Sequence, residues 1–128
     1  MLNRRFLLDS SAWMRYFMGE NDSVCKLVES DEADLYCSVL SFYEIHKILA
    51  KKGIPESDST GFLGVLRRRC TVVGVTEELC LKAAKVSLQH GLYAVDSFIY
   101  CAAVESGATL VTGDSDFRKK KLKNVLIV

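Results

Sequence analysis

Four acidic residues stand where an alternation of strands and helices would bring their side chains together: Asp9, Glu44, Asp96 and Asp114. Two of them directly follow short apolar runs, and the other two lie within helical patterns. Clustered carboxylates repel one another unless a cation joins them. Hard divalent ions such as Mg²⁺ bind through a few carboxylates, keep several waters and leave positions for substrate phosphate. These acids therefore indicate a metal-dependent enzyme that cleaves phosphodiesters.

The elements that must position these acids are predicted from hydrophobic periodicity and from helix start and stop signals. The predicted strands cover residues 5–8, 35–38, 70–75, 109–111 and 125–128. The predicted helices cover residues 10–19, 22–30, 39–52, 55–69, 76–90 and 94–106. Ser10 or Ser11 is predicted to cap the first helix. Strands that alternate with helices in this way indicate an α/β fold with a parallel sheet of four to five strands, flanked by helices on both faces.

Composition sets the class of protein. A chain of 128 residues, 49% hydrophobic, can bury one good core, so residues 1–128 are expected to form one domain. The net charge of +1 gives no overall basic field, so any nucleic acid must meet a local patch. No apolar run reaches the length of a membrane span, and the short N-terminal run lacks the length of a signal peptide core. Five cysteines without a close pair favour a reduced, cytoplasmic protein.

Glu44 is the acid that a surface position explains least well. Residues four apart share a helix face, so Glu44 lies in line with Leu40 and Ile48 and is expected to face inward. A buried carboxylate is costly unless it binds a metal or a basic side chain. A salt bridge to a basic residue is therefore the alternative interpretation.

The other acids each have an ordinary structural explanation as well. Asp96 falls in a first helical turn, where an acid stabilises the helix dipole by roughly 0.3–1 kcal/mol. Asp9 and Asp114 follow strands, and ligands of open α/β sheets bind beyond the carboxyl ends of strands, yet both could be turn or N-cap residues. Asp116 is either a fifth ligand or a first-turn residue of a short helix. Only their convergence would make these acids a site.

Two hydroxyl residues and several cations complete the candidate site. Ser10 and Thr112 adjoin the acids and are expected to bond a carboxylate or a metal-bound water, or to act as caps. The candidate RNA-binding cations are Arg15, Lys47, Lys51, residues 67–69, Arg118, Lys119, Lys120 and Lys121. The run after Asp116 is favoured because it begins next to the site, whereas residues 67–69 can serve a helix C-terminus.

The chain also carries a surplus of large apolar side chains. They are Trp13, Phe17, Phe42, Tyr43, Phe62 and Leu66. Core packing is the default explanation. The alternatives are a dimer face or a groove that receives a helix from a partner.

The acids lie in short motifs: Leu-Leu-Asp-Ser-Ser at Asp9, Ser-Phe-Tyr-Glu-Ile at Glu44, Tyr-Ala-Val-Asp-Ser-Phe-Ile-Tyr-Cys-Ala-Ala at Asp96, and Leu-Val-Thr-Gly-Asp-Ser-Asp-Phe at Asp114. In these motifs, and in their order and spacing, the chain resembles the PIN-domain ribonucleases. It looks most like the small VapC-type toxins of toxin–antitoxin systems. The resemblance covers essentially the whole chain.

This resemblance implies a PIN fold and an endoribonuclease whose Mg²⁺ or Mn²⁺ is held by the four acids of the motifs. Ser10 and Thr112 match hydroxyl positions of the family, and Asp116 matches an acid often present in the closing motif. The resemblance further implies a homodimer and a cognate antitoxin that blocks the acidic pocket. The chain departs from the family at Gly113, where many relatives carry a longer and often basic residue.

Two other functions compete with this interpretation. One is a PIN module that is catalytically weak or silent and acts in RNA or protein binding. The other is a receiver-like signalling domain that binds Mg²⁺, which would need a phosphate-accepting aspartate after the middle strand. Gly74, Val75 and Thr76 stand there instead.

Overall fold

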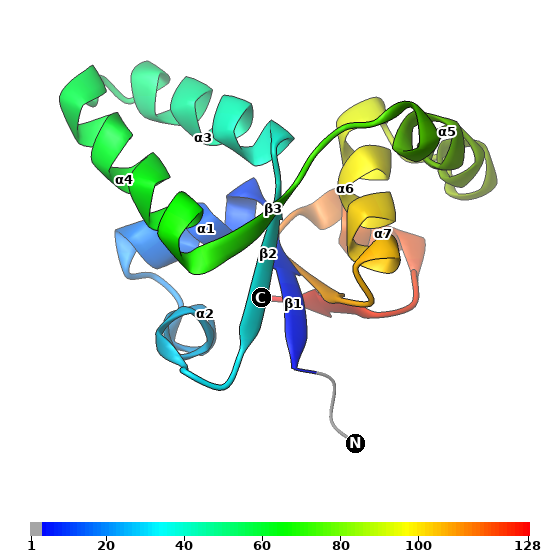
Figure 1. Cartoon of the computed structure of the whole chain (residues 1–128), viewed down its shortest axis with the longest axis horizontal. Helices are drawn as coiled ribbons and strands as arrows, with labels where there is room; N and C mark the ends of the chain where they lie inside the picture. Colours follow the sequence, from blue (N-terminus) through cyan, green and yellow to red (C-terminus); the bar gives the residue numbers. More distant parts are fainter. Residues whose placement is uncertain (1–3) are drawn as a thin grey trace.

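The computed structural model describes residues 4–128, which form a five-stranded parallel sheet between two layers of helices (Figure 1). The predicted α/β fold, with helices on both faces of the sheet, is confirmed. The predicted domain of residues 1–128 begins with three residues outside this described part. The elements are β1 (Arg5–Leu8), α1 (Ser10–Met18), α2 (Asp22–Glu29), β2 (Asp34–Ser38), α3 (Leu40–Lys51), α4 (Glu56–Arg69), β3 (Cys70–Val73), α5 (Glu77–His90), α6 (Ala94–Glu105), β4 (Thr109–Thr112), α7 (Ser115–Lys120) and β5 (Val125–Ile127).

The strand order of the sheet is β3-β2-β1-β4-β5, with β1 at the centre between β2 and β4. The chain runs outward from β1 to β3 and then returns to place β4 on the other side of β1. In such sheets, ligands bind beyond the carboxyl ends of the two strands at which the order reverses. Receiver domains have the order 2-1-3-4-5. The receiver-like alternative is therefore wrong.

Neighbouring residues of the central strands serve two separate cores. Leu7 and Leu110 point into the core beneath α6 and α7, whereas Leu8 and Val111 point into the core beneath α1 to α4. Successive side chains of a strand point to opposite faces, so a strand covered on both faces needs consecutive apolar residues. Both layers of helices are thereby fixed to β1 and β4, the strands that Asp9 and Asp114 follow.

The structure corrects two local predictions. The N-cap of α1 is Asp9, not Ser10 or Ser11, because the Asp9 carboxylate accepts a hydrogen bond of 3.0 Å from the Ala12 N–H. Strand β3 ends at Val73, two residues earlier than predicted. The predicted ends of the helices over residues 10–19 and 76–90 are close to the observed ones, where Gly19 and Gly91 end α1 and α5 with φ of 66°. Glycine adopts this left-handed conformation without steric cost.

Core packing explains nearly all of the surplus apolar side chains. Trp13 and Leu66 are fully buried, and Phe17, Phe42 and Phe62 pack against the same core. Tyr43 differs, because 62% of its surface is exposed. Phe17, Phe42 and Phe62 are only partly buried and Tyr43 lies at the surface of α3, so a dimer face or a groove for a partner helix stays a prediction.

The five cysteines are free thiols, with Cys37 and Cys101 buried and Cys80 partly buried. Across residues 4–128, no helix combines the length and the apolar character needed to cross a bilayer.

Candidate metal centre

Asp9 is the most buried and most firmly bonded acid of the site. It follows β1 and is 4% exposed, and its carboxylate accepts hydrogen bonds from the Ser11 hydroxyl at 2.6 Å, the Ala12 N–H at 3.0 Å and the Thr112 hydroxyl. Burial raises the pKa of Asp9, and these bonds oppose the rise. Asp9 thus ties together β1, the start of α1 and the end of β4. The predicted bond from Thr112 to a site carboxylate is present.

Ser11 is a site residue that the sequence reasoning missed. Its hydroxyl donates to Asp9 and accepts a hydrogen bond of 2.9 Å from the Gly113 N–H, so it links α1 to the loop after β4. The pair of serines after Asp9 was the sequence signal, but periodicity does not say which of them faces β4. Ser10, the predicted one, lies beside the Glu44 carboxyl group and favours its ionised form.

Three half-buried acids gather on the open side of the crevice. One carboxylate oxygen from each of Asp96, Asp114 and Asp116 lies within 4.8 Å of the other two. Asp114 is the N-cap of α7 and accepts a hydrogen bond of 2.9 Å from the Asp116 N–H. Asp116 is therefore both a first-turn residue and a member of the cluster. Burial, followed by repulsion from Asp114 and Asp116, raises the pKa of Asp96 to about 6.

Glu44 reaches the same crevice from the other layer of helices. The buried residues of α3 are Ser41, Ile45 and Leu49. The face of α3 that carries Leu40, Glu44 and Ile48 therefore lies at the edge of the core and is only half-buried. Burial raises the pKa of Glu44, with further contributions from Asp9 and Asp114.

The Glu44 Oε1 atom is buried, and no group in residues 4–128 donates a hydrogen bond to it. The salt-bridge alternative is also wrong for this part of the chain, since no basic group there lies within ion-pair distance of the glutamate. A buried acceptor oxygen beside the acids is therefore left without a hydrogen-bond donor in the described part of the chain.

The donor set fits a hard divalent cation. The clustered ligands are oxygen atoms alone, with no histidine or cysteine among them, as Mg²⁺ and Mn²⁺ prefer. Adjacent ligands of one Mg²⁺ lie about 3 Å apart and opposite ligands about 4.2 Å apart. The three oxygen atoms lie within 4.8 Å of one another, so they would move closer together to bind one ion. A cation would also relieve the repulsion that raises the pKa of Asp96.

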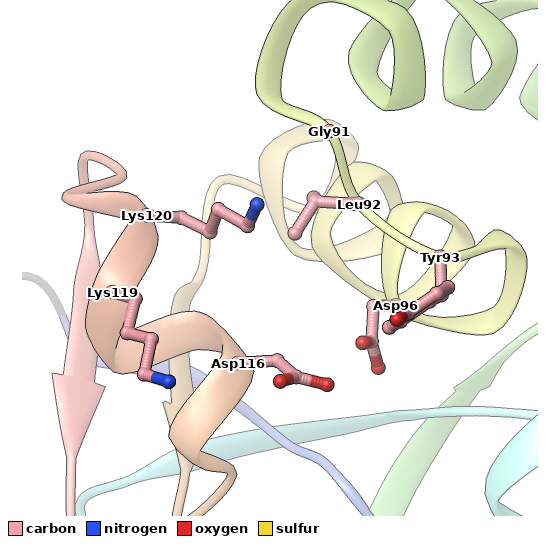
Figure 2. A pocket seen from close by; sticks show the side chains of 7 residues that line it. All are labelled: Gly91, Leu92, Tyr93, Asp96, Asp116, Lys119 and Lys120. Atoms are coloured by element: carbon pink, nitrogen blue, oxygen red, sulfur yellow. The ribbon is translucent and has the colours of Figure 1, made fainter.

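The predicted RNA-binding cations separate into two groups. Lys119 and Lys120 line a cavity of about 220 Å³ together with Asp96 and Asp116 (Figure 2). Arg118 is exposed and does not line this cavity. Lys47 lies over the Tyr43 ring, with its Nζ 5.6 Å from the ring centre. The structure thus brings the two lysines of α7 to the acids.

The arginines have other contacts. Arg15 lies against the loop after β4, where a Cβ added at Gly113 would be 2.7 Å from the Arg15 Nε, and its guanidinium donates to the Val128 carbonyl oxygen at 2.6 Å. Arg69 donates to the carbonyl oxygens of Val28 and Ser30, so it fastens the loop after α2. Of the candidates, Arg15 is the arginine that adjoins the site.

The comparison with protein families decides the assignment. The model of the PIN domain matches residues 6–123. The chain belongs to the PIN domain family. No curated protein sequence matches this PIN domain at a significant level.

Solved structures share the fold of this PIN domain at low sequence identity. A toxin–antitoxin complex from Klebsiella pneumoniae has a TM-score of 0.72 at 13% identity and covers 94% of each chain. VapBC-1 from nontypeable Haemophilus influenzae has a TM-score of 0.73 at 19% identity, over 96% of this chain and 97% of that chain. VapC20 from Mycobacterium tuberculosis, described as a sarcin–ricin loop cleaving toxin, has a TM-score of 0.72 at 17% identity, over 94% and 98%.

Proposed function

We propose that this PIN domain is an endoribonuclease dependent on Mg²⁺ or Mn²⁺. The observation that carries the proposal is the convergence of five carboxyl groups at the carboxyl ends of β1 and β4, where the strand order reverses. The groups belong to Asp9, Glu44, Asp96, Asp114 and Asp116. Their mutual repulsion and open oxygen atoms suit a cation that also binds a substrate phosphate.

Each residue has a distinct role in this proposal. Asp96, Asp114 and Asp116 would hold the ion on the open side, and Asp9 and Glu44 complete the acidic surface behind them. Ser11 and Thr112 hold the Asp9 carboxylate in one orientation through their hydroxyl groups. A bound divalent ion supplies charge stabilisation for the phosphate and lowers the pKa of a water molecule.

The reaction is hydrolysis by in-line attack of water on an RNA phosphodiester. The water oxygen bonds to phosphorus, the bond from phosphorus to the 3′ oxygen breaks, and the 3′ oxygen takes a proton from solvent, so the ends are a 5′-phosphate and a 3′-hydroxyl. The open Oε1 of Glu44 is the acceptor for the water proton. His46 and His90 lie on different helices with exposed side chains, so they offer no histidine pair for cleavage through a 2′,3′-cyclic phosphate.

We further propose that the protein is the cytoplasmic toxin of a toxin–antitoxin pair, with a cognate antitoxin as partner and a homodimer as its own assembly. The similar structures support this role, since one of them is a toxin–antitoxin complex and another is VapBC-1. VapC20, a sarcin–ricin loop cleaving toxin, supports RNA as the substrate. The free thiols agree with a reducing compartment.

The test is cleavage of a mixed pool of structured RNAs by purified protein in Mg²⁺ or Mn²⁺, beside a chelator and an Asp114→Asn variant. Asparagine is as good an N-cap as aspartate, so this substitution preserves the start of α7 and removes one charged ligand. Asp58→Asn is the matched control, because it removes an exposed first-turn acid of α4 outside the site.

We expect metal-dependent cleavage by the parent protein and by Asp58→Asn, and loss of at least about a hundredfold in Asp114→Asn. Equal cleavage by all three proteins would indicate a contaminating nuclease. No cleavage by any of them would favour the silent binding module. Products with a 2′,3′-cyclic phosphate would contradict the hydrolytic mechanism.

A further inference from the structure

A cavity of about 220 Å³ opens directly beside the acid cluster (Figure 2). It is lined by Gly91, Leu92, Tyr93, Asp96, Asp116, Lys119 and Lys120. Its walls are the turn between α5 and α6 on one side and α7 on the other, and the two acids that it shares with the cluster stand between them. Whatever fills this cavity therefore lies next to the proposed reacting phosphate.

The two lysines of the cavity have no acidic partner in the described part of the chain. Asp96 and Asp116 line the same cavity, yet no ion pair joins either of them to Lys119 or Lys120 within residues 4–128. The Lys120 side chain instead crosses to the opposite wall, where its Nζ lies 3.3 Å from the position that a Cβ of Gly91 would take. Two ammonium groups are thus left to meet an anion.

The opposite wall of the cavity offers an aromatic ring with nothing stacked on it. Tyr93 is 75% exposed, and no other ring of residues 4–128 packs against it. Tyr93 is the N-cap of α6, but its side chain makes no capping hydrogen bond and so does not stabilise the start of the helix in this way. Its neighbour Leu92 is buried and gives the cavity an apolar floor.

Two lysine ammonium groups and one free aromatic ring in the same cavity match the two parts of a nucleotide. Lysines bind the phosphate, and exposed aromatic rings stack on bases whatever their sequence. The volume is below the roughly 300–1,000 Å³ of sites for drug-sized ligands, so the cavity has room for no more than one nucleotide. We propose that this cavity is a subsite for one unpaired nucleotide beside the scissile phosphodiester, with Lys119 and Lys120 on its phosphate and Tyr93 on its base.

This inference rests on the proposed function and adds to it a binding site for the base next to the cut. A base within a duplex is stacked on its neighbours and cannot place its face on Tyr93. The subsite therefore favours loops, bulges and ends, and it makes Tyr93 a substrate-binding residue outside the acid cluster.

The first experiment measures binding of a short single-stranded oligouridine in the Asp114→Asn background, where cleavage does not interfere. We expect Tyr93→Ala to weaken binding about tenfold, since loss of one base stack costs roughly 1–3 kcal/mol. Tyr93→Phe keeps the ring and should stay within about twofold of the background protein. Leu88→Ala, which removes an 87% exposed side chain of α5 outside the cavity, is the control and should bind as the background does.

The lysines are tested through the dependence of RNA affinity on salt concentration. Replacing Lys119 and Lys120 together by glutamine should lower the slope of log affinity against log salt by about 1.4, because each contact on a single strand contributes about 0.7. The control changes Lys26 and Lys52 to glutamine, which removes the same charge from exposed positions on α2 and after α3. Its slope should stay close to that of the background protein.

A third readout locates the base itself. Single-stranded RNA that carries 5-iodouridine should crosslink to Tyr93 under ultraviolet light, and a fully paired duplex of the same sequence should not. Crosslinks that map elsewhere, or a Tyr93→Ala variant that binds the oligouridine like Tyr93→Phe, would overturn the subsite. These are binding measurements, so a protein that binds through Tyr93 but never cleaves refutes the proposed nuclease and leaves the subsite standing.

Discussion

The two sides of the acidic crevice differ in how their carboxylates are held. On the closed side, Asp9 is buried and accepts hydrogen bonds from Ser11, Ala12 and Thr112. On the open side, Asp96 and Asp116 are half-buried, and no side-chain hydrogen bond to either carboxylate occurs within residues 4–128. The closed side therefore serves as an anchor for three elements, while the open side keeps its oxygen atoms available for a ligand.

Stability and function are thus divided within one cluster of acids. The bonds of Asp9 hold the crevice in shape when no ligand is present. The acids of the open side oppose folding because they repel one another. A bound cation would remove this repulsion and stabilise the folded state. Measurements of unfolding in metal and in chelator can separate the two contributions.

Metal should stabilise the protein through the open side. At about a hundred times its dissociation constant, Mn²⁺ should raise the free energy of unfolding by about 2.7 kcal/mol, because it binds the folded state. Asp114→Asn should lose most of this gain, and Asp58→Asn should retain it. Urea unfolding with Mn²⁺ and with chelator measures the difference. Equal gains in the two variants would place the ion elsewhere.

Loss of the anchor should destabilise the metal-free protein. We expect Asp9→Ala to lower the free energy of unfolding by about 2 kcal/mol, since it removes the N-cap of α1 and the acceptor of two hydroxyl groups. Asp116→Ala should cost less than about 1 kcal/mol, because the loss of a first-turn acid is offset by the loss of its repulsion with Asp96. Urea unfolding in chelator compares them. Similar costs for both would refute the division between the two sides.

The open side should also make metal-free stability depend on pH. The pKa of Asp96 rises from 3.8 to about 6 on folding, so the folded state binds its proton more tightly than the unfolded state does. Stability should therefore fall as pH rises from about 4 through about 6. At neutral pH, Asp96→Asn should stabilise the protein by about 1 kcal/mol, after allowance for solvent screening of a half-exposed group. Thermal unfolding in chelator at several pH values measures the pH dependence and the effect of Asp96→Asn. If the stability of Asp96→Asn depended on pH as that of the parent protein does, both predictions would be contradicted.

The loop that joins the two sides should show a small, coupled effect. Gly113→Ala should be neutral or slightly destabilising in the parent protein, because its Cβ meets the movable guanidinium of Arg15. Once Arg15→Ala has removed that contact, Gly113→Ala should stabilise by roughly 0.4–1 kcal/mol through the unfolded state. A double-mutant cycle of unfolding free energies measures the coupling. Strict additivity would show that Arg15 does not lie over Gly113 in solution.

Local patterns were sufficient for the elements and for the order of the acids along the chain. The predicted helices over residues 10–19 and 76–90 end close to Gly19 and Gly91, and the strands predicted over residues 5–8 and 109–111 are β1 and β4. Local patterns did not determine which of several adjacent residues takes a given role. The N-cap of α1 is Asp9 and not Ser10 or Ser11, because the Asp9 carboxylate accepts the hydrogen bond from the Ala12 N–H.

The helix face that carries Glu44 is a second case in which local patterns were not sufficient. Periodicity placed it correctly with Leu40 and Ile48, but the helix turns its buried face to Ser41, Ile45 and Leu49. Which of two adjacent stripes meets the core depends on how α3 packs against α1 and α4, and the amino-acid pattern of α3 alone does not determine this. The packing of α3 therefore decides that Glu44 is half-buried and that its Oε1 atom has no hydrogen-bond donor among the described residues.

The succession of strands and helices, the buried positions of the central strands and the acids that follow them can all be read from the amino-acid sequence, because they depend on residues a few positions apart. Three other features required the folded chain: β4 lies beside β1, Ser11 joins Asp9 to Gly113, and Lys120 reaches Gly91 across a cavity. These contacts join residues far apart in the chain. They depend on strand order and helix packing, which local periodicity does not encode.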